Sequence, residues 1–430
     1  MFRIFGRAPF AARPLAATQL PISHSPLRGP GLSQVAAALR KTTESLAREL
    51  VDPTNQAPSW TEFEWRIARA AAAMQGVSSL LRAGLRWQGP DSWHRFLDEQ
   101  QHQSILRHLE IKRLLAEIDS LARCEGAAIV ALKGAALYGN GIYAAGERPM
   151  ADIDLLIREE DMRATARLLE RCGYEAALAS RRHVVFRPRI SKGLTGHLGE
   201  HIDNPIKIEL HTKLAEELPI ETVDITRFVL THSTPGLNPY PSAASLMLHL
   251  LLHAANNMRA RAVRLIQLHD IALLAPRLRA DDWEELLAMR PHGQPLWWAF
   301  APLCLIARYF PAAIPPALSV DRDTMCPWLL RNRARRQLLS DVSWSNLRIA
   351  AFPGLEWSRT PLQGLAFIKS RIWPTREART ELSESASHIP GAAAVPWYGI
   401  SHGARILRWV FTHPPRVQTL LSVRAALTQD

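Results

Sequence analysis

The sequence predicts an α+β fold: a small mixed β-sheet flanked by N-terminal helices and by a larger C-terminal helical region. Apolar residues recur every three or four positions before about residue 125 and again after residue 219, as in helices. Between these points the period changes, and short apolar runs alternate with turns and with one amphipathic helix. We therefore expect five segments along the 430 residues: a disordered basic tail (1–34), an N-terminal helical region (35–125), a core of strands and helices (126–218), a helical domain (219–350) and a Pro- and Trp-rich segment (351–430).

The N-terminal segment carries much of the chain's charge. The net charge is +12, and residues 1–43 contain six basic residues and no acidic one. We interpret this segment as a disordered tail, with an organelle transit peptide as the alternative. A nucleic-acid-binding function through this tail also stays open, and it would show as strongly salt-dependent binding.

Cysteine spacing and apolar runs bear on the compartment. The four cysteines are scattered without close pairs, which favours a reducing, cytoplasmic location: Cys124, Cys172, Cys304 and Cys326. The longest apolar run, residues 295–306, is 12 residues long and contains two prolines. A membrane-spanning helix needs about 20 residues, so we expect no span and interpret this run as a buried helix.

The elements around the predicted core follow from periodicity. Residues 101–126 carry apolar side chains at the three-and-four spacing of one helix face. We expect this helix to end at Gly126, a helix-terminating glycine. We expect strands at 127–133, 152–157, 183–189 and 206–214, with a turn or helix after the first strand and a helix at 158–174. Beyond Pro219, residues 242–258 and 261–278 are strongly helical in pattern.

The stretch RPMADIDLLI, residues 148–157, places two aspartates in a strand. Alternation puts Asp152 and Asp154 on one face, with Ile153 and Leu155 on the other, in the core. Two carboxylates about 7 Å apart repel each other unless a cation lies between them. Hard oxygen ligands of this kind suit Mg²⁺, so the pair predicts a metal site.

A third carboxylate comes from IKIELHTKL, residues 206–214. Glu209 lies on the polar face of this strand, which we expect beside the aspartate strand. Three carboxylates on adjacent strands can hold two divalent ions for in-line phosphoryl or nucleotidyl transfer. Lys133 and Gly134 lie at the end of the first strand, where a glycine lets backbone N–H groups approach a phosphate. Lys133 is either directed to that phosphate or structural.

These motifs together resemble a known family. LKGAALYGNGIYAAGERPMADIDLLIREEDMRATARLLERCGY resembles the core of the nucleotidyltransferase superfamily with the polymerase-beta-type fold, and within it a bacterial family of uncharacterised nucleotidyltransferases. The later I-E-L-H strand fits the same pattern, and weaker similarity reaches helices containing His253 and Asp270 and the segment FIKSRIWPTREA. The resemblance covers roughly residues 100–380.

The resemblance implies residue roles. Asp152 and Asp154 match the metal-binding aspartates, Glu209 the third carboxylate that activates the acceptor hydroxyl, and Gly134 the phosphate-loop glycine. It implies Mg²⁺ or Mn²⁺ as cofactor, a nucleoside triphosphate as substrate and pyrophosphate as product. The acceptor stays open among a small molecule, RNA and protein.

Several residues keep two interpretations. Arg148 either contacts a phosphate or pairs with a nearby acid, and His211 either touches substrate or is structural. His249 and His253 have a spacing that can bind zinc, although helix packing is the simpler interpretation. The alternative function is a catalytically silent regulatory or toxin–antitoxin-type binding protein; Ala135 favours it, because the superfamily often has serine there.

Overall fold

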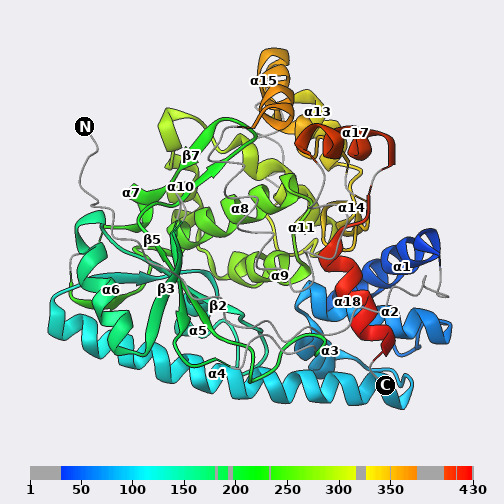
Figure 1. Cartoon of the computed structure of the whole chain (residues 1–430), viewed down its shortest axis with the longest axis horizontal. Coiled ribbons are helices and arrows are strands. Elements are labelled where there is room, and N and C mark those ends of the chain that lie inside the picture. Colours follow the sequence, from blue (N-terminus) through cyan, green and yellow to red (C-terminus); the bar gives the residue numbers. More distant parts are fainter. Residues whose placement is uncertain are drawn as a thin grey trace.

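A six-stranded sheet lies beside a larger body of helices in the computed structural model (Figure 1). The structure describes residues 31–179, 183–191, 197–231, 234–315, 326–348, 350–374, 401–412 and 414–428. The predicted α+β class with a mixed sheet is confirmed. Most of the expected basic tail lies outside the described residues, and the first helix already begins at Leu32.

Four helices precede the sheet: α1 (Leu32–Val51), α2 (Glu62–Gln75), α3 (Ser78–Gly84) and α4 (Asp91–Glu125). α2 begins at a capping box, in which the Thr61 hydroxyl and the Glu64 carboxylate each accept a bond from the other residue's backbone N–H. α4 ends as predicted at Gly126, whose φ is 72°. This 35-residue helix runs beneath both the sheet and α3, so it connects the two parts of the molecule (Figure 1).

The sheet has the order β3-β4-β5-β2-β1-β8. Its strands are β1 (Ala128–Ala131), β2 (Asp152–Leu156), β3 (Tyr174–Ala179), β4 (His183–Pro188), β5 (Lys207–His211) and β8 (Gly236–Asn238). β2 is parallel to β5 and antiparallel to β1, and β5 is antiparallel to β4. A separate antiparallel pair, β6 (Ala215–Glu217) and β7 (Thr222–Asp224), follows β5. The two strands that carry the acidic residues are therefore neighbours in the middle of the sheet.

All four predicted strands are present, and β3, β6, β7 and β8 are additional, the last two in the segment after Pro219 that was expected to be helical. β3 reads YEAALA, whose three alanines give little strand propensity, and β8 has only three residues. The helix predicted at 158–174 is α6 (Met162–Arg171), preceded by a 3₁₀ turn at Glu159–Asp161. The turn or helix after the first strand is α5 (Lys133–Gly139).

One face of the sheet is apolar and covered by α4 and α6. Ile153 and Leu155 of β2 and Ile208 and Leu210 of β5 are fully buried in a cluster with side chains of both helices. Because successive strand residues point to opposite faces, the acidic residues between them project from the other face. The acidic residues therefore lie on the sheet face opposite to α4 and α6.

Helices dominate the rest of the chain. They are α7 (Thr226–Val229), α8 (Ala243–Arg259), α9 (Leu265–Leu274), α10 (Ala280–Ala288), α11 (Phe300–Tyr309), α13 (Trp328–Ala334), α14 (Leu339–Val342), α15 (Pro361–Ile372), α17 (His402–Thr412) and α18 (Val417–Thr428). The apolar run at 295–306 is buried as predicted, in a 3₁₀ turn and the start of α11. None of the described helices is long and apolar enough to cross a membrane.

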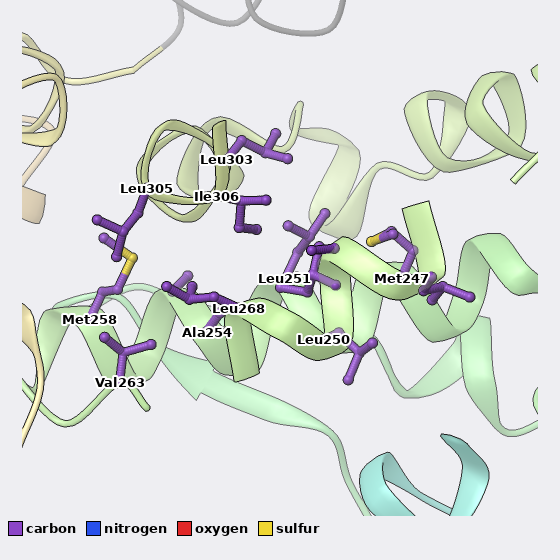
Figure 2. Close-up of a cluster of buried hydrophobic side chains, with 14 of the residues drawn as sticks. Met247, Leu250, Leu251, Ala254, Met258, Val263, Leu268, Leu303, Leu305 and Ile306 are labelled. Atoms are coloured by element: carbon purple, nitrogen blue, oxygen red, sulfur yellow. The ribbon is translucent and has the colours of Figure 1, made fainter. Parts of the chain in front are cut away.

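The core of this helical region is formed by α8, α9 and α11. Figure 2 shows Leu250, Leu251 and Ala254 of α8 near Leu268 of α9 and Ile306 of α11. The same cluster of buried residues continues into the N-terminal helices and to Leu132, the residue before α5. Apolar packing therefore connects the helical region directly to the edge of the acidic site.

The helix α18 returns to the N-terminal helices. Val423 and Ala426 pack in one cluster with Leu39 of α1 and Ile67 of α2. The buried Arg69 donates a 3.0 Å hydrogen bond to the carbonyl oxygen of Ala426. In Figure 1, α18 accordingly lies across α1 and α2.

Candidate active site

The three acidic residues predicted for the site lie on two adjacent strands. Asp154 and Glu209 are direct partners in the parallel register of β2 and β5, and Asp152 stands two residues earlier on the same face. Asp152 is exposed, the Asp154 side chain is buried, and the Glu209 side chain is 24% exposed. The structure therefore brings these carboxylates together on the open face of the sheet.

Their closeness shows in their electrostatics. Burial, followed by repulsion from Asp154 and Asp152, raises the pKa of Glu209 to about 7. Close packing and repulsion from Asp154 also raise the pKa of Asp152, although that side chain keeps contact with solvent. Burial opposes the charge of Asp154, but Lys133 and His211 outweigh it and hold its pKa below the usual range. Asp154 is thus the fixed anion, and the other two carboxylates lack a sufficient counter-charge.

Lys133 supplies the cation of this site. Its Nζ lies 2.8 Å from Oδ1 of Asp154, and its pKa is raised by Asp154, Asp152 and Glu209 against the effect of burial. The residue has φ of 46°, a conformation that is uncommon for a side chain other than glycine, at the start of α5. A strained backbone position beside three carboxylates is typical of a functional residue.

The donor set fits a divalent metal ion. A carboxylate cluster that one ammonium group neutralises only in part favours a further positive charge, and oxygen-only ligands suit Mg²⁺ or Mn²⁺. Asp152, Asp154 and Glu209 are the residues that could hold such an ion. The Lys133 ammonium group lies beside them, 2.8 Å from Oδ1 of Asp154.

Gly134 and Arg148 lie next to each other. A Cβ added at Gly134 would overlap the Arg148 guanidinium and the Met150 sulfur, so only glycine fits here. Arg148 forms an ion pair with Asp270 of α9, with Nη2 and Oδ2 2.8 Å apart. Of the two interpretations of Arg148, pairing with an acid is therefore the one that the structure shows directly.

The two histidines of α8 form part of the packing behind Lys133. His249 Nδ1 lies 2.6 Å from the Tyr240 hydroxyl, and that hydroxyl accepts a 3.4 Å bond from the Lys133 backbone N–H. His253 Nε2 lies 2.8 Å from Nε2 of Gln267. Burial lowers the pKa of both imidazoles, so they are neutral here and their contacts fit helix packing.

Three further residues lie at the site. The sequence indicated His211 only weakly and did not indicate His183 or Arg264. His211 follows Glu209 on the same face, and its Nε2 lies 3.1 Å from Oδ1 of Asp154. His183 of β4 is the strand partner of His211 and had no signal beyond the alternation of its strand. Arg264, just before α9, interacts electrostatically with Asp152 while its Nε donates to the Met74 carbonyl.

Comparison with known proteins agrees with this geometry. The family model described as uncharacterised nucleotidyltransferase matches residues 61–310, more than half of the chain. The protein therefore belongs to this family of nucleotidyltransferases, and the match spans the whole sheet and the helices packed around the site. No curated protein and no solved structure gave a match.

Proposed function

We propose that the protein transfers a nucleoside monophosphate from a nucleoside triphosphate to a nucleophilic acceptor and releases pyrophosphate. The observation that carries this proposal is the parallel register of Asp154 and Glu209, with Asp152 two residues away on the same open face. Family membership supports nucleotidyl transfer in general. The carboxylate arrangement supports its metal-dependent form.

Asp152, Asp154 and Glu209 would hold Mg²⁺ or Mn²⁺. Two such ions, when bound, would neutralise the triphosphate and stabilise the attacking and leaving oxygens of the displacement. Asp154 would be a constantly charged ligand, because it is the most buried of the three and its pKa is held low by Lys133 and His211. Asp152 and Glu209 are more accessible, so one of them would lie nearest the acceptor.

The residues around α5 would bind the triphosphate. The Lys133 ammonium group could exchange its contact with Asp154 for one with a phosphate, since both partners are anionic oxygens. Arg148 is fixed by Asp270 and would place a permanent positive charge beside Gly134. Catalysis would then come from positioning and charge neutralisation, without a covalent intermediate.

The test is label transfer from α-³²P-nucleoside triphosphates. Each nucleotide is supplied separately with Mg²⁺ or Mn²⁺ to an extract of the source organism, which is then separated into RNA, protein and small molecules. We expect label in one fraction with the wild type and with Glu160→Gln, whose carboxylate is exposed and away from the sheet face, but none with Asp154→Asn. The labelled fraction would identify the acceptor class.

The contrary outcome is equally defined. If the folded wild type binds nucleotide but no fraction carries label that depends on Asp154, the transferase proposal fails. The catalytically silent regulatory protein would then be the better description.

A further inference from the structure

A second group of metal-binding side chains lies beside the three carboxylates. His183 of β4 and His211 of β5 are partners in the antiparallel register, and Glu209 is two residues before His211 on the same face. Nε2 of His183 and Nε2 of His211 lie 3.8 Å and 3.7 Å from the same oxygen, Oε2 of Glu209. One ligand atom from each of the three residues lies within 4.8 Å of the other two.

These distances are close to those of a metal site. Imidazole nitrogens and carboxylate oxygens bind Zn²⁺ at roughly 2.0–2.2 Å, so neighbouring ligand atoms of a tetrahedral site are about 3.4 Å apart. Closing the cluster around an ion therefore needs shifts of a few tenths of an ångström between each histidine and Glu209, and of at most about 1.4 Å between the two histidines. Both histidine side chains keep some access to solvent, at 23% and 12% exposure, so an ion can reach them.

The ligand types select a different ion from the carboxylate site. Mg²⁺ prefers oxygen ligands and rarely binds imidazole, whereas first-row transition ions bind imidazole well. Two histidines and one carboxylate leave coordination positions open for water or a substrate, as in catalytic zinc sites. The histidine cluster and the carboxylate cluster share Glu209, so an ion in one would lie next to an ion in the other.

We infer that His183, Glu209 and His211 bind a first-row transition dication, with Zn²⁺ favoured, beside the carboxylate site. The centre would then hold two ions of different chemistry, one on oxygen ligands and one on imidazole. Binding at the histidine cluster does not depend on nucleotidyl transfer. Only the role of the ion, next to the carboxylate that would face the acceptor, rests on the proposed function.

The first test uses Co²⁺ as a spectroscopic substitute for Zn²⁺. The full chain is titrated with Co²⁺ in the presence of millimolar Mg²⁺, and the visible absorption of the cobalt ion is followed. We expect one ion per chain with an absorption spectrum that Mg²⁺ does not remove and Zn²⁺ does. His183→Asn and His211→Asn should each weaken Co²⁺ binding at least about tenfold, while His102→Gln, at an exposed helical histidine, should leave it unchanged.

The second test needs no variant and guards against variants that fail to fold. Cu²⁺, a first-row dication that favours imidazole, is bound at one equivalent to the wild-type chain in millimolar Mg²⁺, and pulsed electron paramagnetic resonance is used to detect coupling to ¹⁴N of bound imidazole. Nitrogen coupling is expected from the histidine cluster and impossible for a carboxylate-only site. Its absence, or cobalt absorption that disappears on adding Mg²⁺, would overturn the inference, while leaving the label-transfer result for Asp154→Asn untouched.

Discussion

Arg148 and Asp270 are joined by two parallel hydrogen bonds, each 2.8 Å long, from Nε to Oδ1 and from Nη2 to Oδ2. The pair is buried, and the Tyr143 hydroxyl donates a further 2.8 Å bond to Oδ1. It connects the segment before β2 with α9, so the aspartate strand is held in place by the helical region. The helices are thus part of how the site is built.

Removal of Asp270, the partner of Arg148, should cause a large loss of stability. Asp270→Ala would leave the Arg148 guanidinium buried without its counter-charge, which costs about 3–5 kcal/mol in the free energy of unfolding. Chemical denaturation measures it. Asp98→Ala, which breaks an exposed ion pair with Arg82, should cost less than about 1 kcal/mol. Equal losses in the two variants would show that the Arg148–Asp270 pair contributes little.

Gly134→Ala should disturb the site more than the fold. Its Cβ would displace Arg148 and Met150, so we expect label transfer to fall at least about tenfold, as a misplacement of about 1 Å can cost more than that. Gly139→Ala, at the other end of α5 where an added Cβ meets nothing within 4 Å, is the matched control. If both variants transfer label equally well, the space at Gly134 is irrelevant to catalysis.

Glu209→Gln should separate stability from activity. At pH 8 the Glu209 carboxylate is charged, although burial and its two acidic neighbours raise its pKa to about 7, so it destabilises the folded state there. The neutral amide removes this repulsion. We expect the metal-free variant to unfold at a higher temperature, because its free energy of unfolding increases by on the order of 1 kcal/mol. Label transfer should be lost. Glu175→Gln, on the exposed side of β3, should change neither property. A less stable Glu209→Gln protein would contradict the repulsion argument.

The buried His249 predicts an acid-sensitive fold. Burial, assisted by Lys133, lowers the pKa of this imidazole to about 3. The unfolded chain, with an ordinary histidine pKa near 6.5, therefore binds a proton between these values that the folded protein does not. Stability should fall as pH drops below about 6.5, by up to about 1.4 kcal/mol per pH unit from this group.

Unfolding by urea at several pH values measures this dependence. His249→Gln should reduce the slope by about one proton between pH 4 and 6, whereas His102→Gln should not change it. An unchanged slope in His249→Gln would contradict the prediction that the His249 imidazole is buried and uncharged in the folded protein.

The sequence predicted the acidic face of the site because a strand has a fixed period of two. In each strand the acidic residues alternate with isoleucines: Asp152 and Asp154 with Ile153, and Glu209 with Ile208. Because the isoleucines face the core, the acidic residues must lie on the other face of the sheet. The relative position of the two strands could be inferred only from the resemblance or from the structure. The parallel register then placed Asp154 directly beside Glu209.

The residues that the sequence could not place are joined by long-range contacts. Arg148 and Asp270 are 122 positions apart, and no local pattern encodes such a pairing. His183 lies beside His211 only because β4 pairs with β5 in a register that makes the two residues partners. The contacts of Gly134 with Arg148 and Met150 are also invisible in the sequence, because both partners come from the segment before β2.

The packing of α18 across α1 and α2 has a consequence for biosynthesis. Arg69 and Ala426, which share a hydrogen bond, are separated by 357 positions. While the ribosome is still making the intervening chain, the apolar side chains of Leu39 and Ile67 are not yet covered by α18. Helices α1 and α2 are therefore completed as structure only after α18 has been synthesised, and during translation they present an exposed apolar surface of the kind that molecular chaperones bind.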